Sequence, residues 1–213
     1  MIDELQMAEL LCTRLCHDLT GPIGAVHNGA EFLSEDGFNM QGQAMELITS
    51  SAFSAVSRLQ FYRMAYGVVR GSGEAGLSDK QKLATDFFAG SKVKLDWPDS
   101  HADAAGVSVS LKMSRLIFNL IIIAHGALIR GGTIAIRVGQ ETDGRKQLIV
   151  SAQGAGLRWD ADMGKILSGE TSPPLDPKNV QVYLTRRFVE DLNATLTCKV
   201  NGEDLVMTVA QPA

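Results

Sequence analysis

Cysteine is scarce in this chain, with only 3 among its 213 residues. An odd number of cysteines does not make a disulfide framework. Cys12 and Cys16 lie one helical turn apart beside His17, but two thiols and one imidazole on a single helix are an incomplete ligand set for a metal ion. We therefore expect small buried thiols and no bound metal or other cofactor.

Positive charge and long apolar runs are scarce as well. The net charge is −4, and residues 1–70 hold four arginines and no lysine against eight carboxylates, which gives no footprint for nucleic-acid binding. The longest apolar run, residues 116–129, is interrupted by Asn119, His125 and Gly126 and is shorter than the roughly 20 residues of a membrane span. No signal peptide precedes the first predicted helix, so we expect a cytoplasmic protein that contacts neither nucleic acid nor membrane.

What the chain has instead is a clear helical period at its start. Apolar residues recur at spacings of three and four, which predicts an amphipathic helix over residues 3–34. The stripe consists of Leu5, Ala8, Leu11, Leu15, Leu19, Ile23, Val26, Ala30 and Leu33. His17 falls off this stripe, so its side chain is expected to face away from the core.

The residues around His17 suggest phosphoryl chemistry. A neutral imidazole nitrogen is a nucleophile near neutral pH, and Asp18 can hydrogen-bond the ring. Pro22 removes a helical hydrogen bond one turn later, and Gly21 and Gly24 loosen the same turn, which favours a bend. His17, Asp18 and Pro22, together with an apolar residue, resemble the H-box of two-component signalling, in which the histidine is phosphorylated. A solvated helix face that happens to carry these side chains is the other interpretation of this short match.

A second periodic segment predicts a helical hairpin. Residues 35–39 are typical of a turn, and the segment that follows would return antiparallel to the first helix. Its apolar face consists of Met45, Ile48, Ala52, Val56, Leu59, Tyr62 and Tyr66. Two long amphipathic helices cannot hide both stripes from water, so we expect the hairpin to form a homodimeric four-helix bundle.

The second half of the sequence predicts a mixed α/β unit, so the fold class is α+β. A glycine-rich linker at residues 71–77 separates a hairpin domain, residues 1–70, from a domain of residues 78–213. Helices are expected at residues 78–88, 110–130 and 178–192, and strands at 92–97, 133–138, 147–151, 194–200 and 205–210. Asp143 and Gly144 would form the turn of a hairpin.

This order resembles the core of a dimeric sensor histidine kinase, a histidine hairpin followed by an ATPase domain of the Bergerat fold. Residues 115–124 look like the N-box, but Ile123 takes the place of the asparagine that would hold Mg²⁺, and an alkyl group cannot ligate this cation. Ala152 replaces the adenine-reading aspartate, although Gly154 and Gly156 remain. Residues 172–179 replace the glycine-rich phosphate lid. We therefore expect this domain not to bind ATP.

A histidine hairpin with a degenerate ATPase domain is similar to the bacterial histidine phosphotransferases of the ChpT type. The resemblance rests on residues 14–19, Pro22, Gly24, residues 28–29 and residues 179–184. It implies a homodimer in which His17 accepts a phosphoryl group from the receiver domain of a hybrid histidine kinase and passes it to response regulator receivers, which in that family control the cell cycle. The partner receiver would bring Mg²⁺.

The resemblance also suggests roles for neighbours of His17. Asp18 would orient the ring, and Arg14, Gly21, Pro22 and Gly24 are candidates for contacting the phosphoryl group or the partner. Arg14 is equally well explained as a surface charge. Gly21 departs from the kinases, which carry Thr or Asn there to position a hydrolytic water, and its small size would spare the phosphohistidine.

Three other functions remain open on the sequence alone. An active ATP-dependent histidine kinase is opposed by Ile123 and Ala152. A non-catalytic dimeric scaffold could bind and sequester response regulators without using His17. A thiol or metal enzyme based on Cys12 and Cys16 has the least support.

Overall fold

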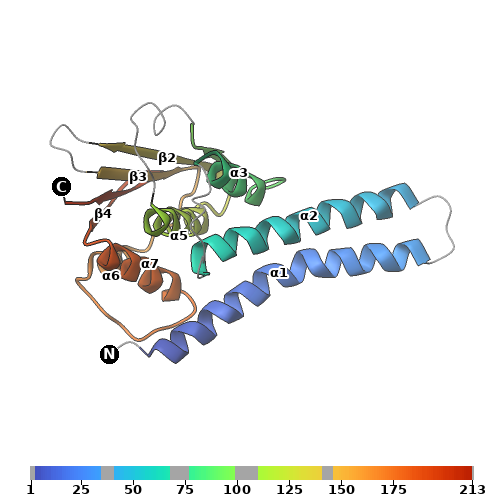
Figure 1. The fold of residues 1–213 in the computed structure, drawn as a ribbon, viewed down its shortest axis with the longest axis horizontal. Helices are drawn as coiled ribbons and strands as arrows, with labels where there is room; N and C mark the ends of the chain where they lie inside the picture. The colour runs from blue at the N-terminus through green and yellow to red at the C-terminus, as the bar shows by residue number, and fades with distance from the viewer. Residues whose placement is uncertain (1–2, 35–40, 68–76, 99–109, 141–145, 213) are drawn as a thin grey trace.

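The computed structural model describes residues 3–34, 41–67, 77–98, 110–140 and 146–212. The turns expected at 35–39 and 143–144 and residues 71–76 of the linker expected at 71–77 lie outside these residues, whereas Leu77, the last residue of that linker, is the first residue of a helix. The elements in chain order (Figure 1) are α1 (Glu4–Ser34), α2 (Gln41–Tyr66), α3 (Leu77–Phe87), β1 (Val93–Asp96), α5 (Leu111–Ala127), β2 (Gly132–Gln140), β3 (Lys146–Gln153), α6 (Ala161–Ser168), α7 (Val180–Asp191), β4 (Thr195–Asn201) and β5 (Asp204–Ala210).

Helices α1 and α2 form the predicted antiparallel hairpin, which extends away from the rest of the molecule (Figure 1). Gly29 lets the two helices approach closely, because a Cβ at this position would lie 2.7 Å from Ile48 Cγ1 and 3.3 Å from the Ala44 carbonyl oxygen. Helix α1 stays continuous through Pro22, and its ribbon changes direction near its middle (Figure 1).

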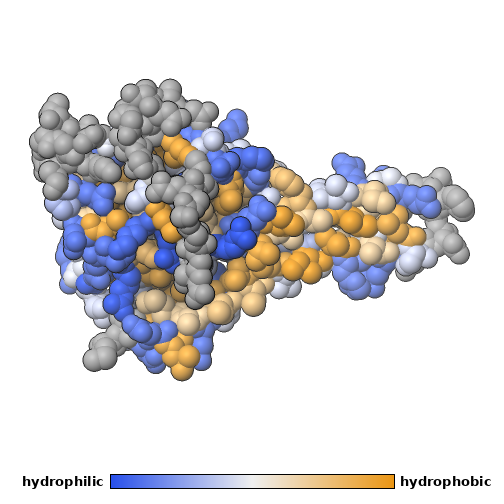
Figure 2. Space-filling view, viewed as in Figure 1, coloured by the Kyte–Doolittle hydropathy of each residue, from blue (hydrophilic) through white to orange (hydrophobic). Residues whose placement is uncertain are grey.

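Much of the apolar surface of the hairpin is uncovered. Within α1 the buried residues are Met7 and Gly29, so the predicted stripe is only partly covered by α2. Figure 2 shows apolar surface running along both helices of the hairpin. Six large apolar side chains of the hairpin are between 47% and 55% exposed: Ile23, Phe32, Met45, Phe53, Val56 and Leu59.

The C-terminal half is a mixed five-stranded sheet with helices packed against it. The strand order is β1-β2-β3-β5-β4, in which β1 and β2 are parallel and the other pairs are antiparallel. Side chains alternate along β5, so that Leu205, Met207 and Val209 are buried, as expected for a strand with one covered face. The predicted α+β class, a helical hairpin followed by an α/β sandwich, is confirmed.

One helix was absent from the sequence-based prediction. Helix α6 has only eight residues, fewer than the window over which an apolar period is recognised in a sequence. Its ends do carry local signatures, since Asp160 caps the N-terminus by accepting a hydrogen bond from the Asp162 backbone N–H, and Gly169 ends the helix in the left-handed conformation (φ 85°).

The base of the hairpin belongs to the same hydrophobic core as the sheet and its helices. Phe61 of α2 is fully buried, and its ring stacks on Phe87 of α3 at 4.1 Å and lies 4.7 Å from Phe118 of α5. Such aromatic contacts fix the position of the end of α2. None of the helices in the described part of the chain combines the length and apolar character needed to traverse a lipid bilayer.

Candidate functional site

His17 lies on the exposed side of α1, as its place off the apolar stripe predicts. Its side chain is 87% exposed, and Nδ1 lies 3.2 Å from Asp18 Oδ1. The other ring nitrogen, Nε2, has no hydrogen bond within the described structure. A neutral ring that keeps its proton on Nδ1 would therefore present the lone pair of Nε2 to solvent.

Asp18 is held from both sides. Its Oδ1 faces His17, and its Oδ2 accepts a hydrogen bond from the hydroxyl of Tyr62 on α2. Burial alone would raise the pKa of Asp18, but the hydrogen bonds from Tyr62 and His17, together with the charges of Arg14 and Arg58, outweigh this effect and hold the pKa below its usual range. Asp18 is therefore an ionised, oriented neighbour of the His17 ring.

Tyr62 is a site residue that sequence reasoning missed. The sequence predicts Tyr62 only as a member of the apolar face of α2, and its side chain is indeed buried, with 3% exposure. A hydroxyl on a buried face needs a partner, and that need was the available clue. Burial and the adjacent Asp18 raise the pKa of Tyr62, so the phenol stays protonated and donates to the carboxylate.

A chain of hydrogen bonds continues from this site toward the sheet domain. The ring of Tyr66 stacks on Tyr62 at 5.3 Å, and its hydroxyl donates to Gln181 Oε1 of α7 at 2.6 Å. Gln181 Nε2 donates to Asn119 Oδ1 of α5 at 2.7 Å, and Asn119 Nδ2 donates to the Ala65 carbonyl at 2.9 Å. Buried polar groups that satisfy one another in this way fix the end of α2 against α5 and α7.

The turn after His17 leaves open space. A Cβ added at Gly21 or Gly24 would meet no atom within 4 Å. Packing within one chain therefore does not explain why these two positions lack side chains, in contrast to Gly29. Gly21, one turn after His17, is exposed, so the helix surface beside the imidazole is open, which is compatible with the predicted partner contact.

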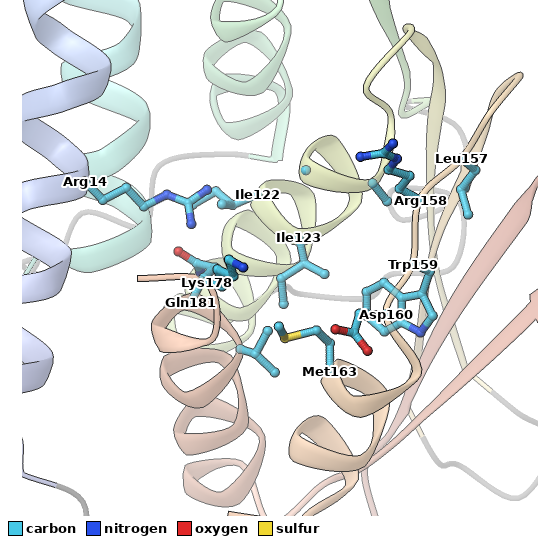
Figure 3. A pocket seen from close by; sticks show the side chains of 13 residues that line it. Arg14, Ile122, Ile123, Leu157, Arg158, Trp159, Asp160, Met163, Lys178 and Gln181 are labelled. Atoms are coloured by element: carbon cyan, nitrogen blue, oxygen red, sulfur yellow. The ribbon is translucent and has the colours of Figure 1, made fainter. Parts of the chain in front are cut away.

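Arg14 points elsewhere than the outward face of His17. Figure 3 shows its side chain extending from α1 toward α5 and α7, where it lines a cavity with Lys178 and Gln181. Its charge still acts on Asp18, whose pKa it helps to lower. The structure thus places Arg14 between the hairpin and the sheet domain, and its proposed contact with a phosphoryl group stays a prediction.

Some of the residues that resemble a kinase nucleotide site line this cavity. The cavity has a volume of about 530 Å³, and Ile123 contributes an apolar side chain to it. Ala152 is fully buried in β3, and Gly156 adopts a left-handed conformation (φ 73°). Residues 172–178 have no helix or strand of their own, and Lys178 lines the cavity.

The expectation of buried thiols at the start of the chain was wrong. Cys12 and Cys16 are both exposed, whereas Cys198 is partly buried. Neither α2 nor the sheet domain covers the part of α1 that carries these two thiols. Among the residues that the structure describes, no group of three or more His, Cys, Asp or Glu side chains is arranged to hold a metal ion.

Comparisons with known proteins give the chain its family. The family model described as the histidine phosphotransferase C-terminal domain matches residues 77–204. The protein phosphotransferase ChpT of Brucella abortus (strain 2308) is 34% identical over 210 residues, which are 97% of this chain and 96% of that protein. A solved structure of a bacterial phosphotransferase matches with a TM-score of 0.78 and 32% identity over 98% of both chains. A blue-light activated histidine kinase of Erythrobacter litoralis matches with a TM-score of 0.47 and 14% identity, over 93% of this chain and 59% of that one. On the family model and the full-length relative, this chain belongs to the histidine phosphotransferases.

Proposed function

We propose that this protein is a phosphotransferase of a bacterial phosphorelay and that His17 carries the phosphoryl group. The observation that supports this most directly is the pairing of an 87% exposed imidazole with a carboxylate that is itself anchored by a buried tyrosine. The name of the full-length relative, protein phosphotransferase, agrees with this activity. The donor would be the receiver domain of a hybrid histidine kinase, and the acceptors would be response regulator receivers.

The transfer step needs little covalent work from the protein. The lone pair of His17 Nε2 attacks the phosphorus of the receiver's aspartyl phosphate, the P–N bond forms, and the P–O bond to the receiver's carboxylate breaks. The proton on Nδ1 remains between the ring and Asp18, whose negative charge stabilises the cationic phosphoimidazole. The reverse step, onto another receiver, uses the same geometry with His17 as the leaving group.

In this proposal the partner supplies the metal ion, and no nucleotide is needed. We expect the Mg²⁺ of the transfer step to be held by the acidic pocket of the receiver, since both oxygens of Asp18 are already engaged. We also expect transfer without ATP, because Ile123 and Ala152 replace the side chains with which the kinases hold Mg²⁺ and adenine.

We further propose that the working form is a homodimer, formed through the exposed apolar face of the hairpin. Burial of a large apolar side chain stabilises by about 1.5–3 kcal/mol, and each protomer would contribute several such side chains. The variant Leu59→Glu should convert the dimer to a monomer in sedimentation analysis. The matched control is Val200→Glu on β4, also a half-exposed apolar residue, which should leave the dimer intact. Wild-type protein that sediments as a monomer would refute this proposal.

The test of the function is transfer of radiolabelled phosphate from a purified phosphorylated receiver domain. Wild-type protein should acquire acid-labile label, and His17→Ala should acquire none. The variant His27→Ala is a matched control, because His27 lies on the same helix, is 71% exposed and also has a carboxylate neighbour, Glu31 at 3.4 Å. It should be labelled like the wild type.

Other outcomes separate the remaining candidates. Label acquired from ATP alone would point to a kinase. A scaffold that sequesters regulators predicts two results together. The wild type would acquire no label from any of several phosphorylated receivers, and the His17→Ala variant would still bind receivers normally.

A further inference from the structure

Three cationic side chains from separate parts of the chain line the cavity of Figure 3. They are Arg14 of α1, Arg158 in the segment before α6 and Lys178 in the segment before α7. None of them forms an ion pair or a side-chain hydrogen bond with another residue that the structure describes. The carboxylate that also lines the cavity, Asp160, is engaged as the cap of α6 by the Asp162 N–H at 2.9 Å. The cavity is therefore positive within a chain whose net charge is −4.

The floor of the same cavity is apolar and well covered. Ile122, Ile123 and Val182 are between 3% and 7% exposed, and they meet the half-buried side chains of Met163 and Trp159 at one end. Figure 3 shows Ile123, Met163 and Trp159 around the same hollow. A volume of about 530 Å³ is typical of sites for small organic ligands, which combine apolar walls with a few polar groups.

The backbone that carries two of the cations is fixed before any ligand arrives. The backbone N–H groups of Lys178 and Asn179 donate to Asp176 Oδ1 at 2.7 and 2.8 Å, and Asn179 Oδ1 accepts in return from the Asp176 N–H at 2.9 Å. The N–H of Arg158 donates to the Ala127 carbonyl at 2.9 Å. Such preorganisation lowers the cost of binding, because only the side chains have to be ordered.

We propose that this cavity binds a small organic phosphate without a metal ion. The apolar or aromatic body of the ligand would lie on Ile123 and against Trp159, and its phosphate would be held by Lys178 with Arg14 or Arg158. Guanidinium and ammonium groups neutralise phosphate directly and bind it with charge-assisted hydrogen bonds. They would thus supply the charge for which a kinase site uses Mg²⁺. This inference goes beyond the proposed function and does not depend on His17.

The experiment is calorimetric titration of the full chain with AMP and with UMP in buffer containing EDTA. Both probes should bind, with affinities that differ little, because Ile122, Ile123 and Val182, which form the floor, carry no polar group to distinguish the bases. Adenosine, which lacks the phosphate, and inorganic phosphate, which lacks the apolar body, should each bind at least about tenfold more weakly than AMP. Addition of Mg²⁺ should not strengthen binding.

Matched variants connect the binding to the cavity. Lys178→Gln and Arg158→Gln should each weaken AMP binding at least about fivefold, whereas Lys199→Gln, which removes an exposed lysine of β4, should not change it. The thermal midpoint of each variant is measured to confirm that it is folded.

Several results would overturn the proposal. They are an absence of AMP binding, equal binding of AMP and inorganic phosphate, and equal effects of the cavity variants and Lys199→Gln. A fourth is the combination of two results: AMP does not bind, and Lys178→Gln and Arg158→Gln lose affinity for the receiver. This combination would assign these cations to an acidic protein partner instead.

Discussion

Replacing Tyr62 with phenylalanine removes one oxygen atom and the hydrogen bond that anchors Asp18. Hydrogen bonds to charged groups contribute about 1.5–3 kcal/mol, and water can replace part of this one because the Asp18 side chain is 25% exposed. We therefore expect a loss of about 1 kcal/mol in the free energy of unfolding, or about 2–4 °C in thermal midpoint for a chain of this size. Without the anchor, Asp18 orients the His17 ring less well, and we expect phosphoryl transfer to slow by about three- to tenfold.

The assay is single-turnover transfer from a phosphorylated receiver to His17, measured together with the pKa of Asp18 by NMR. That pKa should rise in Tyr62→Phe, since the lost hydrogen bond stabilised the ionised form. Tyr66→Phe is the matched control: this ring belongs to the same stack, but its hydroxyl donates to Gln181. It should lower stability without slowing transfer. Equal slowing by both variants, or an unchanged rate in Tyr62→Phe, would refute the positioning role of Tyr62.

Three further perturbations test other parts of the molecule. Gly29→Ala should lower the free energy of unfolding by about 1–3 kcal/mol because its Cβ would collide with α2. Gly24→Ala should not lower it, since its Cβ would meet no atom within 4 Å; denaturant titration of both variants would decide. Burial lowers the pKa of His125 in the folded protein. As the pH falls below about 6.5, the unfolded chain therefore binds more protons at this residue than the folded chain does, and the free energy of unfolding decreases. The variant His125→Asn should flatten this fall in thermal midpoint and the exposed His27→Asn should not. Gly21→Asn has space for its side chain and should accelerate dephosphorylation of a phosphorylated regulator; an unchanged rate would contradict the idea that Gly21 protects the phosphohistidine.

Local periodicity was enough to predict the elements of the fold and the exposure of His17. The heptad-like spacing of α1 places every residue of that helix on a known side, so the outward direction of His17 followed from the positions of its apolar neighbours alone. The same reasoning gave the hairpin, the long buried helix α5 and the strands. It was weakest for α6, whose eight residues are fewer than the window over which an apolar period is recognised in a sequence.

The contacts that complete the site could not be read from the sequence, because they join distant segments. Tyr62 meets Asp18 only because the close approach at Gly29 sets the register of α1 against α2. Arg14 and Lys178 share a cavity only once α7 has packed beside α1. The exposure of Cys12 has the same origin: this residue lies four positions after Ala8 of the apolar stripe, and only the packed structure shows that neither α2 nor the sheet domain covers it.

The polar chain from Tyr66 through Gln181 to Asn119 bears on how this protein can be divided. The hairpin looks like a detachable module in the linear sequence, yet cutting the chain after α2 would uncover Phe61 and deprive the Tyr66 hydroxyl of its acceptor. It would also deprive the Asn119 amide of the Ala65 carbonyl. A chimaera that grafts this hairpin onto another sheet domain would have to carry over α5 and α7 with it. The hairpin that carries His17 therefore has to be exchanged or engineered together with the domain that supports it.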